Sequence, residues 1–295
     1  MIQTAKDIKP QISQIFISIF LIFIMNSKRK FDKIVSDIKK VKIQGARNIA
    51  KAALKAYFLI PSPKSKERLL ASRPTEPMME HVLSLAKNHS EKQILRHFDE
   101  AQKKINMHAF KLVKNNDVIF THCHSTNVNN ALIYSKKRGK RFEVYNTETR
   151  PLHQGRKTAL ELGKARIKVT MFIDSAAAIA IEKDNKKDRI YANKVFLGAD
   201  ALLNNGIINK VGSGLISEIA HNHKIPVYII ADSWKYTKEK VPIEQRPLNE
   251  IWDRAPKNIR IKNPAFEFVQ KKYVKAIVSE LGILKYDAFV RKLKE

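Results

Sequence analysis

The sequence has few of the residues on which several common kinds of site depend. Only one of its 295 residues is cysteine, which excludes an intramolecular disulfide and any multi-thiolate metal centre. Glycine occurs only nine times, and neither the GxGxxG nor the GxxxxGK[ST] pattern is present. A dinucleotide site and a P-loop nucleotide site therefore have no support. The scarcity of cysteine fits a reducing compartment, and we expect a cytoplasmic protein.

Acidic residues are also scarce. The chain has 28 Asp and Glu residues against 56 Lys and Arg residues, which gives a formal net charge of +28. Such a charge favours polyanionic partners, either nucleic acid or phosphorylated metabolites. The lysines are scattered in pairs, however, with no long basic tract and no interleaving of arginine with aromatic residues. We therefore interpret the charge as biased composition and do not expect nucleic acid as a partner.

No apolar run is long enough to cross a bilayer. The longest, Ile15 to Met25, has 11 residues, whereas a spanning helix needs about 20. Its length suits the apolar core of a signal peptide, but Asn26-Ser27-Lys28-Arg29-Lys30 follows in place of a cleavage site. The favoured interpretation makes Met25 the true start and residues 1–25 an apolar N-terminal extension. A short interfacial anchor and ordinary packing are the alternatives, and no stable membrane insertion is expected.

Residues 26–113 have a helical pattern. Apolar residues recur mostly at spacings of three and four, and no alternation with a period of two interrupts them. Pro61-Ser62-Pro63 breaks the run, as proline does in helices. The pattern predicts an N-terminal helical domain whose core includes Ile34, Ile38, Val41, Ile49, Ala53, Leu54, Leu95, Phe98, Ile105 and Phe110.

From residue 114 to residue 295, short apolar runs alternate with amphipathic segments. Strands are predicted at 118–120, 142–145, 169–173, 195–197 and 227–230, and helices at about 127–137, 155–165, 175–182 and 212–223. This alternation implies a parallel sheet with helices on both faces. The predicted fold class is therefore α/β, with an N-terminal helical domain followed by a Rossmann-like parallel sheet domain.

Polar groups follow every predicted strand, and parallel sheets bind their ligands at the carboxyl ends of strands. One such ending would be read as a helix cap, but five together predict one lined cleft. The segments are His122-Cys123-His124-Ser125, Asn146-Thr147-Glu148-Thr149-Arg150, Asp174-Ser175, Asp200, and Asp232-Ser233-Trp234-Lys235.

The single cysteine, Cys123, directly follows the first of these strands. A solitary cysteine is usually an inert buried side chain, and its position at a strand end is what favours a chemical role. In an extended segment His122 and His124 would share one face, with Cys123 on the other. Two histidines are too few ligands for a metal site, so we expect neither a metal nor another cofactor.

Several motifs occur in a recognisable order: Thr121-His122-Cys123-His124-Ser125, Thr147-Glu148-Thr149-Arg150-Pro151, Asp174-Ser175-Ala176-Ala177, Gly198-Ala199-Asp200, and Ile208-Asn209-Lys210-Val211-Gly212. Through them the chain resembles the superfamily of sugar-phosphate isomerases related to the alpha, beta and delta subunits of translation initiation factor 2B. Within it, the chain most resembles the archaeal ribose-1,5-bisphosphate isomerases. The resemblance covers about residues 31–285.

The resemblance implies a catalytic pair, Cys123 and Asp200, that converts α-D-ribose 1,5-bisphosphate to ribulose 1,5-bisphosphate. Cys123 would protonate the ring oxygen and then remove the proton at C2, while Asp200 would move a hydroxyl proton. The resemblance also implies a homo-oligomer, either a dimer or a hexamer built from dimers, and a product that enters nucleotide salvage in AMP metabolism. The candidate substrate-binding residues are Gly45, Ala46, Arg47, Arg73, Ser125, Arg150, Gln154, Asn209, Lys210 and Lys235.

The chain departs from the isomerase pattern in one place. The group usually has Arg-Gly-Ala-Gly where this chain has Gln44-Gly45-Ala46-Arg47, so a charge expected at a phosphate is missing. We expect Arg47 to supply that charge from one turn away. If it does not, the alternative interpretation is favoured, in which the chain is a non-catalytic subunit similar to those of initiation factor 2B. An isomerase of the methylthioribose-1-phosphate type is the third alternative.

Overall fold

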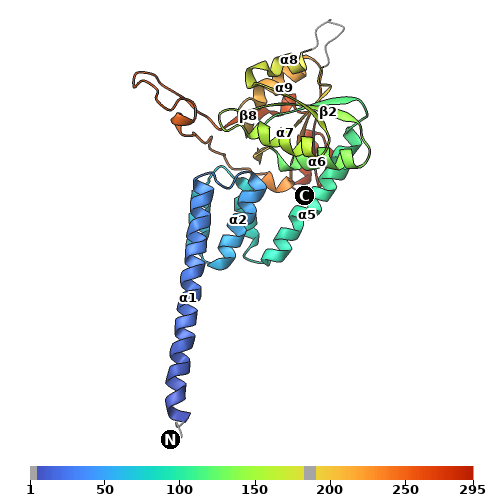
Figure 1. The fold of residues 1–295 in the computed structure, drawn as a ribbon. Coiled ribbons are helices and arrows are strands. Elements are labelled where there is room, and N and C mark those ends of the chain that lie inside the picture. The colour runs from blue at the N-terminus through green and yellow to red at the C-terminus, as the bar shows by residue number, and fades with distance from the viewer. Residues whose placement is uncertain (1–4, 183–190, 295) are drawn as a thin grey trace.

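The computed structural model describes residues 5–182 and 191–294 (Figure 1). The first half is helical, as predicted, and the long first helix extends away from the rest of the molecule in Figure 1. Most of the predicted core positions of this half are buried, Ile38, Ile49 and Phe98 among them. The helices are α1 (Ala5–Lys39), α2 (Ala46–Leu59), α3 (Pro63–Ser72), α4 (Pro77–Leu85) and α5 (Glu91–Leu112).

Local signals set the helix boundaries. The Ser62 hydroxyl accepts a hydrogen bond from the Ser65 N–H (3.1 Å) and caps α3, with proline at the first helical position. Ser90 and Gln93 form a reciprocal capping box at the start of α5. The break at Pro61-Ser62-Pro63 is therefore a helix end followed by a new helix start.

The apolar run Ile15 to Met25 lies within α1, which continues without interruption past residue 25. Residues 1–4 of the expected extension lie outside the described part of the chain. Side chains 21–25 are exposed, and Met25 keeps 69% of its surface in solvent, whereas Phe31 and Ile38 are buried further along the same helix. Among the residues that the structure describes, none of the helices is long and apolar enough to cross a bilayer.

The second half contains a seven-stranded sheet in the order β10-β9-β7-β4-β1-β2-β3. All neighbouring pairs are parallel except the last, β9 with β10. The five predicted strands are confirmed, while β9 and β10 lie beyond the prediction. The strands are β1 (Asp117–Thr121), β2 (Phe142–Thr147), β3 (Lys168–Phe172), β4 (Lys194–Leu197), β7 (Val227–Ile230), β9 (Ala276–Ser279) and β10 (Gly282–Leu284).

Helices cover both faces of this sheet, as the sequence predicts (Figure 1). Neighbouring residues of β1 point to opposite faces of the sheet. Phe120 packs with the buried residues of α8, α9 and α10 on one face, and Ile119 packs with those of α5, α6 and α7 on the other. Helix α5 thus belongs to both halves of the chain. The flanking helices are α6 (Thr126–Lys137), α7 (Gln154–Lys164), α8 (Ala177–Ile181), α9 (Ser213–Asn222) and α10 (Tyr286–Lys292).

A small antiparallel sheet, which the sequence did not predict, lies beside the large one. It consists of β5 (Ala201–Leu202), β6 (Gly206–Lys210) and β8 (Phe266–Gln270) in the order β5-β6-β8. Residues that the sequence placed in a polar loop after the fourth predicted strand therefore belong to β6. The register pairs Lys210 with Phe266, so the end of β6 is held against the beginning of β8.

Trp234 joins the helical half to the sheet half. It lies in the short 3-10 helix η2 (Ser233–Lys235), which follows β7, and its ring stacks on His97 of α5 with centroids 3.4 Å apart. The His97 Nε2 lies 3.1 Å from Asp232 Oδ1, and Trp234 also packs against the helical core. The strand end that carries Asp232 and Lys235 is thereby fixed against α5.

Candidate active site

A cavity of about 90 Å³ lies at the carboxyl ends of the parallel strands, and we call it the carboxyl-edge cavity. Its wall combines residues that precede α2, follow β1, precede α7 and end β6. Five of the predicted site residues line it: Gly45, Arg73, Cys123, Gln154 and Lys210. The helical half and the sheet half both contribute to this wall, as a cleft at strand ends requires.

Cys123 is held in an unusual backbone conformation. Its φ is +66°, in the left-handed region, so the expectation of an extended segment that presents His122 and His124 on one face is wrong. The Cys123 N–H donates to Thr149 Oγ1 (3.0 Å), and its carbonyl accepts from the Thr158 hydroxyl (2.9 Å). These bonds fix the thiol at the cavity wall.

The surroundings of Cys123 keep its thiol protonated. Burial raises the pKa of the thiol to about 11, although the nearby Lys210 ammonium acts to lower it. An ordinary cysteine thiol has a pKa of about 8.5. At neutral pH this thiol is neutral, so it is ready to donate a proton.

The His122 side chain forms hydrogen bonds that connect two strand ends. Its Nε2 lies 2.8 Å from the Val211 carbonyl, which can only accept, so Nε2 carries the hydrogen and Nδ1 accepts from the Thr147 hydroxyl at 2.5 Å. Burial lowers the pKa of His122, which keeps the ring neutral. His124 instead meets Glu161 Oε2 at 2.9 Å. The two histidines therefore have separate partners.

Asp200 lies close to Cys123 across neighbouring strands. β1 and β4 pair in parallel, Cys123 and Asp200 follow their ends, and a Cβ added to Gly198 would lie 2.6 Å from Ser125 Oγ. No residue in the described part of the chain hydrogen-bonds the Asp200 carboxyl. Burial raises the pKa of Asp200, while Lys235, Arg73 and Lys210 oppose that rise. The same Asp200 charge helps to raise the pKa of Cys123.

Buried cations surround this pair. Lys210 is only 5% exposed, and within residues 5–182 and 191–294 its ammonium group has no hydrogen bond or ion pair. Arg73 donates from Nη2 to Glu244 Oε2 (3.0 Å), but its buried Nε and Nη1 have no hydrogen-bond partner. Lys235 donates to the Ala199 carbonyl. Unpartnered cationic donors in a buried wall are what binding of a phosphate group requires.

The model of the Initiation factor 2 subunit family matches residues 63–286 of this chain. The chain belongs to that family. It is 29% identical to the ribose 1,5-bisphosphate isomerase of Methanocaldococcus jannaschii, covering 90% of this chain and 94% of that protein. It is 30% identical to the enzyme of the same name from Thermococcus kodakarensis, covering 89% and 93%.

The fold of this family member is also similar to that of a solved relative. The crystal structure of the translation initiation factor eIF-2B from Pyrococcus horikoshii matches it with a TM-score of 0.75 at 25% identity, covering 86% of this chain and 96% of that one. The family thus includes proteins named as isomerases and proteins named as initiation factors. The choice between these functions depends on the site.

The site of this family member also contains charged residues that the sequence analysis missed. Glu76 is 3% exposed, its Oε2 has no hydrogen-bond partner, and Arg73 Nε lies 3.6 Å from its Oε1. Burial, followed by the Asp200 charge, raises the pKa of Glu76 to about 8. Its one sequence signal is its position three residues after Arg73, which is one of the candidate substrate-binding residues. Arg246 lines the cavity and pairs with Glu244 and Glu250, with no local signal.

Other predicted site residues do not line the carboxyl-edge cavity. Arg47 bonds Asp99 Oδ1 (2.7 Å) and Gln102 Oε1 (3.3 Å) on α5, so the expectation that it replaces the charge missing at Gln44 is wrong for this structure. Ala46 is buried in the helical core. Arg150 is exposed and its backbone N–H donates to Asp174, Asn209 bonds Ser213, and Ser125 caps α6. Asp200 and Lys235 are not among the residues that line the cavity.

Proposed function

We propose that the chain is a sugar-phosphate isomerase that converts α-D-ribose 1,5-bisphosphate to ribulose 1,5-bisphosphate. The observation that carries the proposal is the pairing of a protonated thiol, Cys123, with an unpartnered carboxyl group, Asp200, at neighbouring strand ends. The buried Lys210 acts on both groups. Relatives named as ribose 1,5-bisphosphate isomerases, at about 30% identity, support the choice of substrate.

The first steps use the thiol. Cys123 donates its proton to the ring oxygen as the bond between that oxygen and C1 breaks, which leaves a thiolate and opens the sugar. The thiolate then removes the proton from C2, and a double bond forms between C1 and C2. A thiol whose pKa is about 11 suits both steps, because it stays protonated until it reacts and then becomes a strong base.

The last steps use the carboxylate. Asp200 takes the proton of the 2-hydroxyl group as C2 becomes a carbonyl, and the thiol returns a proton to C1. Asp200 then passes its proton to the Cys123 thiolate, which restores both groups for the next turnover. The product has the same atoms as the substrate, so no redox partner is required. The cations around Asp200 stabilise the negative charge that develops on the C2 oxygen during this transfer.

Two sets of groups are suited to hold the phosphates. Arg73 offers two nitrogens without a hydrogen-bond partner, of which Nε also lies 3.6 Å from Glu76 Oε1. Lys210 offers an ammonium group with which no described residue forms a hydrogen bond or ion pair. Gly45 has a φ of +84° and caps the N-terminus of α2, where backbone N–H groups point outward. Arg246 and Lys157 add charge to the same wall. Arginine suits phosphate because its planar fork binds two oxygens.

The cavity must open to accept this substrate. A volume of about 90 Å³ lies well below the usual range for small-molecule sites, about 300–1,000 Å³, and is too small for a sugar with two phosphates. The wall consists of segments from both halves of the chain. We therefore propose that the helical segments around Gly45 and Arg73 move away from the strand ends when substrate binds.

The test is turnover of ribose 1,5-bisphosphate by the purified full chain, with ribulose 1,5-bisphosphate detected by NMR or mass spectrometry. We expect wild-type turnover, and a loss of at least about a thousandfold in Cys123→Ser and in Asp200→Asn. Ser84→Ala on the exposed surface of α4 is the control for the effect of mutation and purification on activity. Near wild-type activity in either site variant would refute the assignment of that residue.

The same assay separates the alternatives. An isomerase of the methylthioribose-1-phosphate type would turn over 5-methylthioribose 1-phosphate in preference to the bisphosphate. A non-catalytic subunit would turn over neither, and the similarity to the eIF-2B structure keeps that function in view. We also propose a homo-oligomer, either a dimer or a hexamer built from dimers, which sedimentation at several concentrations tests.

A further inference from the structure

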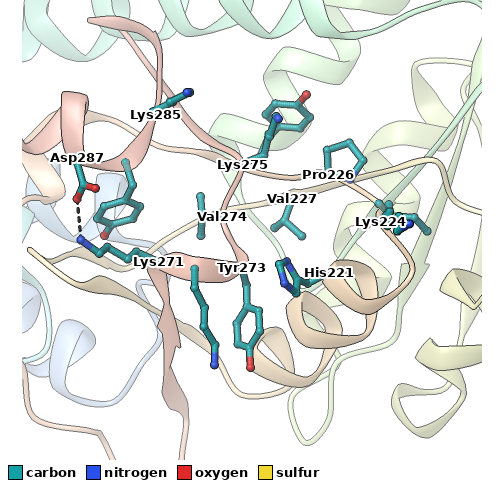
Figure 2. Close-up of a pocket in the computed structure, with 14 residues that line it drawn as sticks. His221, Lys224, Pro226, Val227, Lys271, Tyr273, Val274, Lys275, Lys285 and Asp287 are labelled. Atoms are coloured by element: carbon teal, nitrogen blue, oxygen red, sulfur yellow. Dashed lines mark hydrogen bonds and ion pairs between the residues drawn. The ribbon is translucent and has the colours of Figure 1, made fainter.

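A second, larger cavity lies at the opposite edge of the large sheet, and we call it the amino-edge cavity (Figure 2). Its volume is about 740 Å³. The residues that line it begin β7, precede β9, end α9 and begin α10. Buried Val227 and Val274 lie at its centre, so it has an apolar floor. The proposed isomerase chemistry uses none of these residues.

The wall of the amino-edge cavity is strongly basic. It contains one carboxylate, Asp287, whose Oδ1 pairs with Lys271 Nζ at 2.7 Å. Within the described residues, Lys224, Lys275 and Lys285 have no acidic partner. The five lysines of the wall are Lys224, Lys271, Lys272, Lys275 and Lys285.

Short, hydrogen-bonded connections hold these lysines in place. The Lys275 N–H donates to the Val227 carbonyl (2.8 Å), and the Val274 N–H donates to the Lys271 carbonyl (3.0 Å). Lys224 directly follows α9, whose end is closed by a bond from the Ile225 N–H to the Ala220 carbonyl (2.7 Å). The backbones of the lysines are therefore fixed, and the segments that precede β7, β9 and α10 bring their charges together.

The charges are spread across the floor of the cavity. Figure 2 shows Lys285 and the Lys271–Asp287 ion pair on one side of the two valines, Lys224 on the other, and Lys275 between these two outer groups. Three tyrosine rings complete the wall: Tyr228, Tyr273, which packs edge-on against His221, and Tyr286, whose hydroxyl donates to the Leu203 carbonyl. A ligand that satisfies both groups must carry negative charge at two separated points.

We propose that the amino-edge cavity binds a small molecule with two phosphoryl groups at opposite ends of a compact body. Lysine ammonium groups bind phosphate as point charges, and the apolar floor with its aromatic wall suits the part of the ligand between them. The volume lies within the usual range for small-molecule sites, about 300–1,000 Å³. The lysines gather in a hollow, which suits a compact anion better than an extended nucleic-acid strand.

The test measures binding of fructose 1,6-bisphosphate by calorimetry to the full chain in the Lys210→Gln background, which weakens anion binding at the carboxyl-edge cavity. We expect the double variant Lys224→Gln/Lys285→Gln to weaken binding by about tenfold or more. The matched control is Lys103→Gln/Lys104→Gln, which removes two exposed lysines from α5 and has the same net charge. Fructose 6-phosphate, with one phosphoryl group, is expected to bind more weakly than the bisphosphate.

A variant that is expected to strengthen binding provides a second test. Asp287→Asn frees Lys271 from its ion pair, so we expect tighter binding of the bisphosphate. An equal loss in the two double variants would show that net charge alone attracts the probe, and the proposal would fail. It would also fail if the Lys210→Gln protein bound no bisphosphate, or if Asp287→Asn weakened binding.

Discussion

The two edges of the large sheet differ in how they hold charge. At the carboxyl edge the cavity is about 90 Å³, and the charged groups in and near its wall are buried, with Arg73 Nε 3.6 Å from Glu76 Oε1. At the amino edge the cavity is about 740 Å³, and its lysines are exposed. Cavity volume alone would favour the amino-edge cavity as the active site. Buried charged groups with shifted pKa values favour the carboxyl edge as the proposed site of proton transfer instead.

The same strands serve both edges. β7 begins at the floor of the amino-edge cavity with Val227, and its other end leads to Lys235, which acts on Asp200. The sheet separates the two cavities and supports both. The comparison of the two edges indicates two uses of lysine in a basic chain. Exposed lysines attract anions, and buried lysines shift the pKa values of neighbouring groups.

The largest expected effect concerns crowding along α7. A Cβ at Gly155, at the carboxyl-edge end of the helix, would lie 1.8 Å from the Thr147 carbonyl oxygen, whereas one at Gly163, near the other end, meets nothing within 4 Å. Gly155→Ala should lower the free energy of unfolding by at least about 3 kcal/mol or prevent folding. Gly163→Ala should raise it by about 0.5–1 kcal/mol. Denaturant unfolding measures both, and equal stabilities would contradict the tight packing at the carboxyl edge.

The second effect compares a buried cation with an exposed one. Lys210→Gln should lower kcat/KM for ribose 1,5-bisphosphate by about a hundredfold, because the cation is lost from a buried wall. Lys103→Gln on exposed α5 should change it by less than about twofold. Steady-state kinetics give both values. Similar losses in the two variants would mean that the whole charge of the protein, and not its buried part, acts on the substrate.

The third effect is a dependence of stability on pH. The pKa of Glu76 rises from 4.5 to about 8 on folding, so the unfolded chain loses this proton first as the pH rises. The free energy of unfolding should therefore fall between about pH 4.5 and pH 8 through this group. Glu76→Gln removes that slope, while Glu80→Gln, exposed on the same helix, should keep it. Urea unfolding at pH 5, 6.5 and 8 compares them, and parallel slopes in all three proteins would contradict the burial of an acid at this edge.

The smallest expected effect reports opening of the carboxyl-edge cavity. Trp234 lies between the two halves, and Trp252 is half exposed. In a Trp252→Phe protein that also carries Cys123→Ser, the fluorescence of Trp234 should change by a small, saturable amount when ribose 1,5-bisphosphate is added. Fructose 6-phosphate is the control ligand. An unchanged signal with bound bisphosphate would show that the halves do not separate.

The sequence predicted the large sheet well because its signals are local. Each of the five apolar runs is a strand, and the polar residues that follow them meet at one edge because parallel strands end together. The small sheet had no such signal. Gly206 pairs with Gln270, and a pairing over that separation leaves no mark in either segment alone. Lys210 was therefore reached through resemblance, without knowledge of the strand that positions it.

The site was only partly predictable for the same reason. Cys123 and Asp200 follow strands, so position alone indicated their proximity. Arg47 is close in sequence to Gly45, but it extends to Asp99 on α5 because that partner is available only in the folded chain. Glu76 and Arg246 gain their importance from burial and from pairing with distant residues, neither of which spacing records.

The raised pKa of Cys123 also bears on how the protein meets oxidative stress. Peroxides and disulfides react with the thiolate form of cysteine, and this side chain holds its proton up to about pH 11. Cells under oxidative attack lose enzymes that depend on acidic, exposed thiols first. A chain whose one thiol stays protonated until substrate binds would remain active after such enzymes have been inactivated by oxidation.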